Sequence, residues 1–72
     1  MPSIRLPRTL HAYCVALSGE TGISLRTVIR WAADETDSSP ATAYACLAAT
    51  RQLYGLSRRE LFDLCPWELP AS

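Results

Sequence analysis

Lysine is absent from the 72-residue chain, so all seven of its basic side chains are arginines. Arginine presents a planar fork of donors that suits a phosphate or a guanine edge, although the arginine codons of a GC-rich genome would explain the same bias. Apolar runs that approach the roughly 18 residues of a membrane span are also absent. The N-terminus has no apolar segment followed by a small-residue cleavage site. These absences predict a soluble, cytoplasmic protein with no membrane partner.

The three cysteines of the chain do not indicate a disulfide framework. Cys14, Cys46 and Cys65 are odd in number and far apart. With His11 they could supply four zinc ligands, but only His11 and Cys14 are close in sequence, whereas zinc ligands usually come in close pairs. We therefore expect buried thiols, with no metal and no other cofactor.

The single histidine and the three glycines argue against catalysis. His11 has no nucleophile and acid at local spacing, and the glycines form no phosphate-binding loop. A domain of this size also offers little concavity for a small-molecule substrate. We do not expect an enzyme.

The charge is balanced overall but uneven along the chain. The formal net charge is zero, so bulk attraction alone would not hold nucleic acid. Residues 1–30 nevertheless carry four arginines and one acid, a balance of +3, and residues 31–72 carry three arginines and six acids, a balance of −3.

The length indicates one domain spanning residues 1–72.

Helix signals dominate the chain, and no segment alternates as a strand would, so the fold is predicted to be all-α. Proline at position 7 places the first helix after it, with an end near Gly19 or Gly22. Capping serines precede the other helices, at Ser24, at Ser39 before a proline, and at Ser57, where Glu60 completes a capping box. The predicted helices cover about 10–19, 24–33, 40–54 and 58–65, followed by an extended tail at 66–72.

The third predicted helix contains many small residues. At helical spacing they suggest a stripe that would let neighbouring helices approach closely. Its predicted members are Ala41, Tyr44, Ala45, Leu47, Ala48 and Leu53, with Cys46 beside them.

Residues 21–31, TGISLRTVIRW, combine a turn signal with a two-faced helix. On a helical wheel, the apolar residues Leu25, Trp31 and Ala32 fall near Val28. The two arginines of the segment, Arg26 and Arg30, fall on the opposite side. Gly22 permits the left-handed backbone of a sharp turn, and Ile23 could fill the angle between two helices. The segment therefore predicts helix, tight turn, helix.

Residues 13–64, about 70% of the chain, resemble a helix-turn-helix domain of the lambda repressor and Cro-like family. LSGETGISLRTVIRW at 17–31 is similar to the two central helices, the segment from Pro40 to the family's fourth helix, and LYGLSRRELF at 53–62 to its closing segment. The resemblance implies a compact domain of four to five helices with the helix-turn-helix at about 13–33. It departs from the family in a shortened region before the motif, and in Tyr13 and Cys14 where a polar residue is common.

The family's helix-turn-helix reads the major groove with the start and outer face of its second helix. By position, the resemblance assigns the core to Ile23, Val28 and Trp31, and the DNA-facing surface to Ser24, Leu25, Arg26, Thr27, Ile29 and Arg30, with Thr27 available to a phosphate. We expect Arg26 and Arg30 to contact bases and Arg58 and Arg59 to act differently, on phosphates. An ordinary surface helix, with Arg30 paired to Asp34, is the alternative explanation of the arginines.

These observations predict a small phage- or plasmid-type transcription regulator, a repressor that binds double-stranded operator DNA as a homodimer through helix 24–33. Trp67 and Leu69 are the expected dimer contacts, because Pro66 separates them from the last helix. The tail could instead fold back on its own core. The alternative function is a helical protein-interaction module, an inhibitor or adaptor that keeps the fold without binding DNA.

Overall fold

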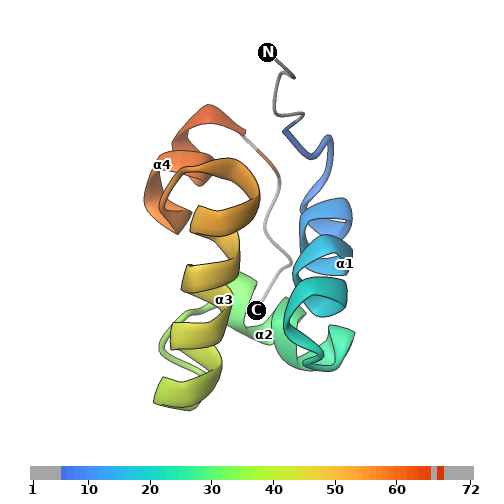
Figure 1. Ribbon diagram of the computed structural model, residues 1–72, viewed down its shortest axis with the longest axis vertical. Coiled ribbons are helices and arrows are strands. Elements are labelled where there is room, and N and C mark those ends of the chain that lie inside the picture. Colours follow the sequence, from blue (N-terminus) through green and yellow to red (C-terminus); the bar gives the residue numbers. More distant parts are fainter. Residues whose placement is uncertain (1–5, 66, 68–72) are drawn as a thin grey trace.

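The computed structural model describes residues 6–65 and residue 67, which form four helices and, within that part of the chain, no strand. The helices are α1 (Leu10–Thr21), α2 (Leu25–Ala33), α3 (Pro40–Tyr54) and α4 (Arg58–Leu64) (Figure 1). The all-α prediction is confirmed. Residues 6–9 precede α1 without a helix of their own, so the described chain has four helices.

Capping side chains set the helix starts. Ser24, Ser39 and Ser57 each accept a hydrogen bond from the backbone N–H three residues on, and Glu60 completes the capping box of α4. Thr9, which sequence reasoning did not single out, caps α1 by accepting from the N–H of Ala12 at 3.0 Å. Because each cap satisfies an otherwise unpaired donor, these short helices begin at defined residues.

Two glycines end helices in the left-handed conformation. Gly22 closes α1 at φ 76° and Gly55 closes α3 at φ 70°, where a side chain would be strained. Gly19, the other predicted end of the first helix, lies inside α1 instead.

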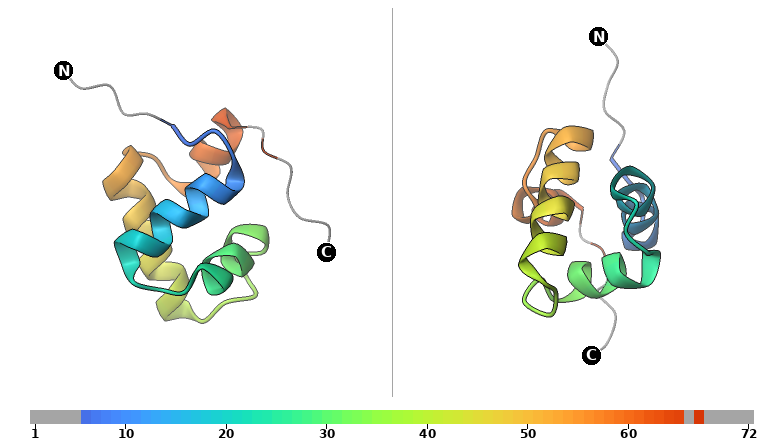
Figure 2. Two further views of the ribbon diagram at one scale, coloured as in Figure 1. Left: turned by 90° about the vertical axis from the view of Figure 1, so that its right-hand side faces the viewer. Right: turned by 60° about the horizontal axis from the view of Figure 1, so that its bottom comes forward.

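The helices α1 and α3 lie side by side, and α2 crosses one end of the pair (Figures 1 and 2). The last helix, α4, packs near the opposite end of α3. The loop at 34–39 connects α2 to α3. This arrangement places the predicted recognition helix at one end of the molecule.

Tyr13 of α1 is the centre of an aromatic cluster. Its ring centroid lies 6.5 Å from that of Trp31, 6.0 Å from Tyr54, 5.9 Å from Phe62 and 5.3 Å from Trp67. Such distances are typical of favourable ring pairs. Tyr13 and Trp31 are completely buried, as are Leu17, Val28 and Leu61 around them. One residue of α1 thereby contacts aromatic side chains from α2, α3, α4 and the chain beyond α4.

The phenol of Tyr13 is buried with a hydrogen-bond partner. Its oxygen lies 2.6 Å from Oγ1 of Thr50, and the Thr50 hydroxyl donates to the carbonyl oxygen of Cys46 at 2.7 Å. Since Thr50 uses its proton on that carbonyl, Tyr13 must be the donor to Thr50. This chain of bonds explains a fully buried threonine in α3 and fixes α1 against α3.

The small-residue stripe predicted for the third helix is wrong. The buried residues of α3 are Cys46, Ala49 and Thr50, whereas Tyr44 is 76% exposed and Ala41, Leu47 and Ala48 also face outward. Of the predicted stripe, Leu53 does pack against the core. The predicted stripe did not include Thr50, whose burial is favourable because its side chain hydrogen-bonds the Tyr13 hydroxyl.

Trp67 packs against its own chain. Its ring stacks on Tyr13 and meets Phe62 edge-on at a centroid distance of 5.2 Å. This is the fold-back alternative, and it corrects the expectation that Trp67 is left without cover for a second subunit. Leu69, the other expected dimer contact, lies outside the described residues.

Cys14, Cys46 and Cys65 are free and buried, as the sequence predicted. His11 is exposed on α1, and within residues 6–65 and 67 no group of three or more potential metal ligands occurs. In the same part of the chain, no helix has the length and apolar character needed to cross a bilayer.

Replacement of Trp31 by alanine should lower the free energy of unfolding by about 3–5 kcal/mol, because it removes a fully buried indole from a small core. Chemical denaturation followed by circular dichroism measures the change. The exposed Tyr44→Ala variant is the control and should unfold within about 0.5 kcal/mol of the parent. Equal stability of the two variants would contradict the packing described.

Alkaline pH should destabilise the domain. Burial raises the pKa of the Cys14 thiol from 9.0 to about 11 and raises the pKa of the Tyr13 phenol well above its ordinary value. Both groups are neutral when protonated, so their contribution to stability is complete below about pH 9. The contribution of Cys14 is lost as the pH rises through about 11, and that of Tyr13 is lost at still higher pH. The melting temperature should therefore fall over this range, and less steeply in Cys14→Ala. A constant melting temperature would be inconsistent with these shifts.

Candidate nucleic-acid interface

The turn between α1 and α2 consists of residues 22–24 and is held by side chains of α1. The Ser18 hydroxyl donates to the carbonyl oxygen of Ile23 at 2.7 Å. Thr21 donates to the Leu17 carbonyl at 2.7 Å and accepts from the Ile23 N–H at 3.1 Å. With the left-handed Gly22, these bonds determine the direction in which α2 leaves the turn. Sequence reasoning named the glycine and missed Ser18 and Thr21.

The two faces of α2 are as predicted from the wheel. Val28, Trp31 and Ala32 are completely buried, and Arg26 and Arg30 are exposed on the other side. Ile23 packs against the core from the turn, also as expected. The buried face fixes the rotation of the helix, so both arginines are presented to solvent.

Ser24 and Thr27 form a small hydroxyl pair at the start of α2. Ser24 accepts from the Thr27 backbone N–H at 3.4 Å and donates its hydroxyl to Oγ1 of Thr27 at 2.9 Å. This leaves the Thr27 hydroxyl proton free to donate outward. The amino-terminal turn of α2 thus offers a hydroxyl donor beside the exposed Arg26, at the positive end of the helix dipole.

The other two residues predicted to face DNA are half buried. Leu25 and Ile29 both pack against the core, so only part of each side chain is accessible. The exposed surface of α2 is consequently narrower than predicted and consists mainly of Ser24, Arg26 and Arg30, with part of Thr27.

Arg30 pairs with Asp37 rather than with Asp34. Its Nη2 lies 3.2 Å from Oδ2 of Asp37, and both side chains are more than half exposed. Asp34 instead accepts from the hydroxyl and backbone N–H of Thr36, which lower the pKa of its carboxyl. Of these two loop carboxylates, Asp34 is therefore bonded within the loop and Asp37 is paired with a side chain of α2. Among the described residues Arg26 forms no ion pair. The start of α2 therefore carries an unpaired positive charge, whereas the arginine near its end is paired with a carboxylate.

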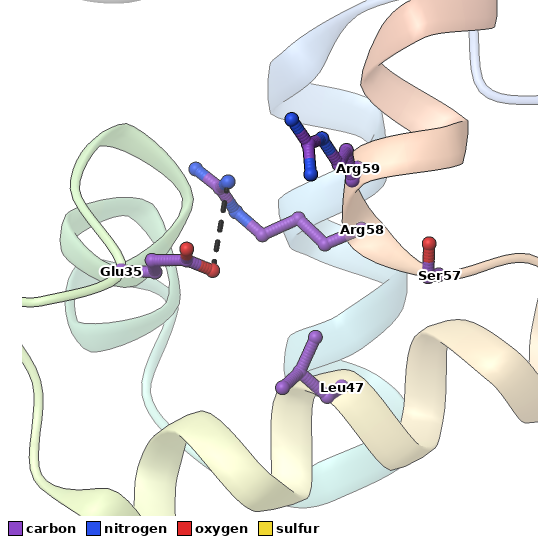
Figure 3. Close-up of a pocket in the computed structure, with 5 residues that line it drawn as sticks. All are labelled: Glu35, Leu47, Ser57, Arg58 and Arg59. Carbon is purple, nitrogen blue, oxygen red and sulfur yellow. Dashed lines mark ion pairs between the residues drawn. The ribbon is translucent and has the colours of Figure 1, made fainter.

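Arg58 is structural, which corrects the expectation that it contacts phosphate. Its side chain is only 17% exposed, and its Nη2 donates to the carbonyl oxygen of Ala32, in the last turn of α2, at 2.7 Å. The guanidinium carbon lies 4.5 Å from the ring centroid of Phe62 and 5.4 Å from that of Trp31. Figure 3 shows the side chain reaching from α4 toward Glu35, whose Oε2 is 3.7 Å from Nη1.

This contact joins residues 26 positions apart, and no local sequence signal indicates it. A cation that donates to an unpaired carbonyl at the carboxyl end of a helix is favoured by both the hydrogen bond and the helix dipole. Arg58 therefore fixes the end of α2 that lies away from the turn. The exposed Arg59 remains available to a ligand.

Comparisons of the chain with protein-family models, curated proteins and solved structures found no match. The site is accordingly defined by its own geometry, a solvent-facing arginine surface on a helix fixed at both ends.

Replacement of Arg58 by alanine should lower the free energy of unfolding by about 2–3 kcal/mol, because a charge-assisted hydrogen bond and two ring contacts are lost together. The adjacent Arg59→Ala removes the same charge from the surface and should change stability by less than about 0.5 kcal/mol. Denaturant titration of both variants measures the difference. If both lose the same stability, Arg58 does not hold α2.

Proposed function

We propose that the protein is a sequence-specific DNA-binding regulator of the helix-turn-helix class, similar to the lambda repressor and Cro-like family, and that it represses transcription from operator DNA. The observation that carries this proposal is the exposed arginine surface of α2, presented by a three-residue turn and a fully buried back face. A short turn containing glycine between two packed helices is the general form of the motif.

The amino-terminal half of α2 is the part that enters the major groove in this proposal. There Arg26 can form two hydrogen bonds to a guanine, and the Thr27 hydroxyl can donate to a phosphate. Arg30 lies one turn further along the helix and must leave Asp37 to reach a base. The exposed Arg30–Asp37 pair contributes at most about 1 kcal/mol, so a base contact can replace it.

Homodimerisation is part of the proposal for a reason of size. One module of this length contacts few base pairs, whereas a two-fold dimer binds two half-sites about one helical turn apart and multiplies the discrimination. Because Trp67 is covered by Tyr13 and Phe62, the dimer surface is not assigned to that side chain.

A helical protein-interaction module is the second candidate function. The net charge of zero weakens non-specific attraction to DNA, and α3 exposes Tyr44 together with Leu47. Exposed apolar side chains of this size are common in protein contacts. In this alternative the arginines of α2 serve solubility.

Selection of random duplexes by the protein, followed by affinity measurements, tests the proposal. Arg26→Ala should weaken binding to the selected site by about 1–3 kcal/mol and affect a scrambled duplex far less, because it removes base contacts. Arg30→Ala should show the same pattern. The control, Arg51→Ala, removes an equal charge from the exposed surface of α3 and should reduce both affinities slightly and equally.

Equal losses on both duplexes for Arg26→Ala would exclude base recognition by this helix. A failure of selection to enrich any sequence, with folded protein, would favour the interaction module. Sedimentation of the complex gives its stoichiometry, and one protein per site would contradict the dimer.

A further inference from the structure

The outer face of α3 is apolar and exposed. Tyr44 is 76% exposed and Leu47 is 38% exposed. Ala41 and Ala48 lie on the same face, three and four residues from Tyr44 along the helix, and are exposed too. Among the described residues, the other aromatic side chains are buried or half buried, so Tyr44 is the ring that this part of the chain leaves uncovered.

An open pocket of about 320 Å³ lies beside this face, with Leu47 in its lining. Glu35 from the loop after α2 and Ser57, Arg58 and Arg59 from the start of α4 complete it (Figure 3). Arg59 is exposed and, within the described residues, forms no ion pair. The Glu35 side chain is 53% exposed. The pocket therefore presents an apolar side chain between an accessible cation and an accessible carboxylate.

We propose that the outer face of α3 and this pocket form the contact between two copies of the chain, with Tyr44 of each copy in the pocket of the other. Tyr44 precedes Leu47 by one helical turn, so the uncovered ring and the pocket are neighbours on one surface. A two-fold axis that passes between them forms both contacts at once. This is the isologous arrangement, in which the same surface patch of each copy is self-complementary.

The phenol of Tyr44 matches the chemistry of the pocket. Its ring covers Leu47, the negative face of the ring meets the guanidinium of Arg59, and its hydroxyl donates to the Glu35 carboxylate. Tyrosine and arginine are the residue types that most often anchor protein contacts. The chain has a formal net charge of zero, so two copies do not repel each other at long range.

The contact is small, which makes the dimer weak. A standard interface has about 20–30 residues on each side, far more than this face and pocket supply. We therefore expect a dissociation constant of about 100 μM without DNA. At the low micromolar concentrations of an unfolding measurement the chain is then monomeric, so Tyr44→Ala keeps the stability of the parent.

On DNA the weak contact is sufficient. Two half-sites hold the copies side by side, which makes their association effectively intramolecular. This step rests on the proposed function and supplies the dimer surface that it needs, whereas association of the free protein does not depend on DNA.

Sedimentation equilibrium between about 10 μM and about 1 mM protein tests the contact, because this range spans the expected dissociation constant. Tyr44→Ala should raise that constant about ten-fold or more, as truncation of an interface anchor does. The control Leu64→Ala removes another exposed apolar side chain, on α4 and outside the pocket, and should leave the constant unchanged. A parent that stays monomeric at about 1 mM, or a Tyr44→Ala variant that associates like the parent, would overturn the proposal.

Arg59→Gln separates the ring contact from general charge effects. The two arginines of the pocket outweigh its one glutamate, so loss of a positive charge should strengthen association if only charge repulsion mattered. We expect weakening by about three-fold or more instead, because the contact between cation and ring is lost. Arg8→Gln makes the same charge change outside the pocket and should have no effect. Stronger or unchanged association of Arg59→Gln would reject the proposed pocket contact.

A mixture of two variants tests whether the contact is reciprocal. Tyr44→Ala removes the ring and keeps the pocket, and Leu47→Arg obstructs the pocket and keeps the ring. Each variant alone lacks both contacts of the dimer, whereas the mixed pair regains one of them. With both variants folded by circular dichroism, the mixture should associate more tightly than either variant alone, and equally weak association would contradict the two-fold arrangement.

DNA binding provides a separate readout. Affinity is measured for the duplex recovered by selection and for a shortened duplex with a single half-site. Tyr44→Ala should bind the complete duplex about ten-fold more weakly and the single half-site as the parent does. If the parent associates through this face but binds no DNA, the interface stands and the proposed function fails. If Tyr44→Ala binds the complete duplex as a dimer with the affinity of the parent, the function stands and this interface fails.

Discussion

The burial of Tyr13 is the constraint on which the rest of the structure depends. Its ring contacts Trp31, Tyr54, Phe62 and Trp67, which come from every other part of the described fold. Its hydroxyl needs a partner because it is removed from water, and Thr50 supplies one. A domain this small has a limited apolar core, so one polar aromatic side chain with a satisfied hydroxyl determines how α1, α3 and α4 meet.

The position of α2 follows from that core. Trp31 and Val28 anchor its inner face, the bonded turn at 22–24 fixes its start, and Arg58 fixes its end. A helix held at three places loses little conformational freedom when it binds a ligand, which favours specific recognition. The same contact from Arg58 places a charged, partly open pocket directly behind the helix.

The two ends of α2 differ in charge. The start of the helix presents Arg26 and hydroxyl groups at the positive end of the dipole, and the loop beyond its other end carries Asp34, Glu35 and Asp37. Two of these carboxylates lie near Arg30 and Arg58, and Thr36 holds the third. A neutral protein can thereby present a local positive surface, since charge is screened beyond about 10 Å at ordinary salt.

The sequence by itself determined the elements and the faces of α2. Caps at Ser24, Ser39 and Ser57, the glycine at 22 and the wheel around Val28 are local signals, because the groups involved lie within a few residues of one another. Only the tertiary structure decided the buried face of α3, the cover over Trp67 and the role of Arg58. Each depends on a partner far away in the chain: Tyr13 for Thr50 and Trp67, and Ala32 for Arg58. Short-range patterns carry no information about which distant groups will satisfy a buried polar atom or cover an aromatic ring.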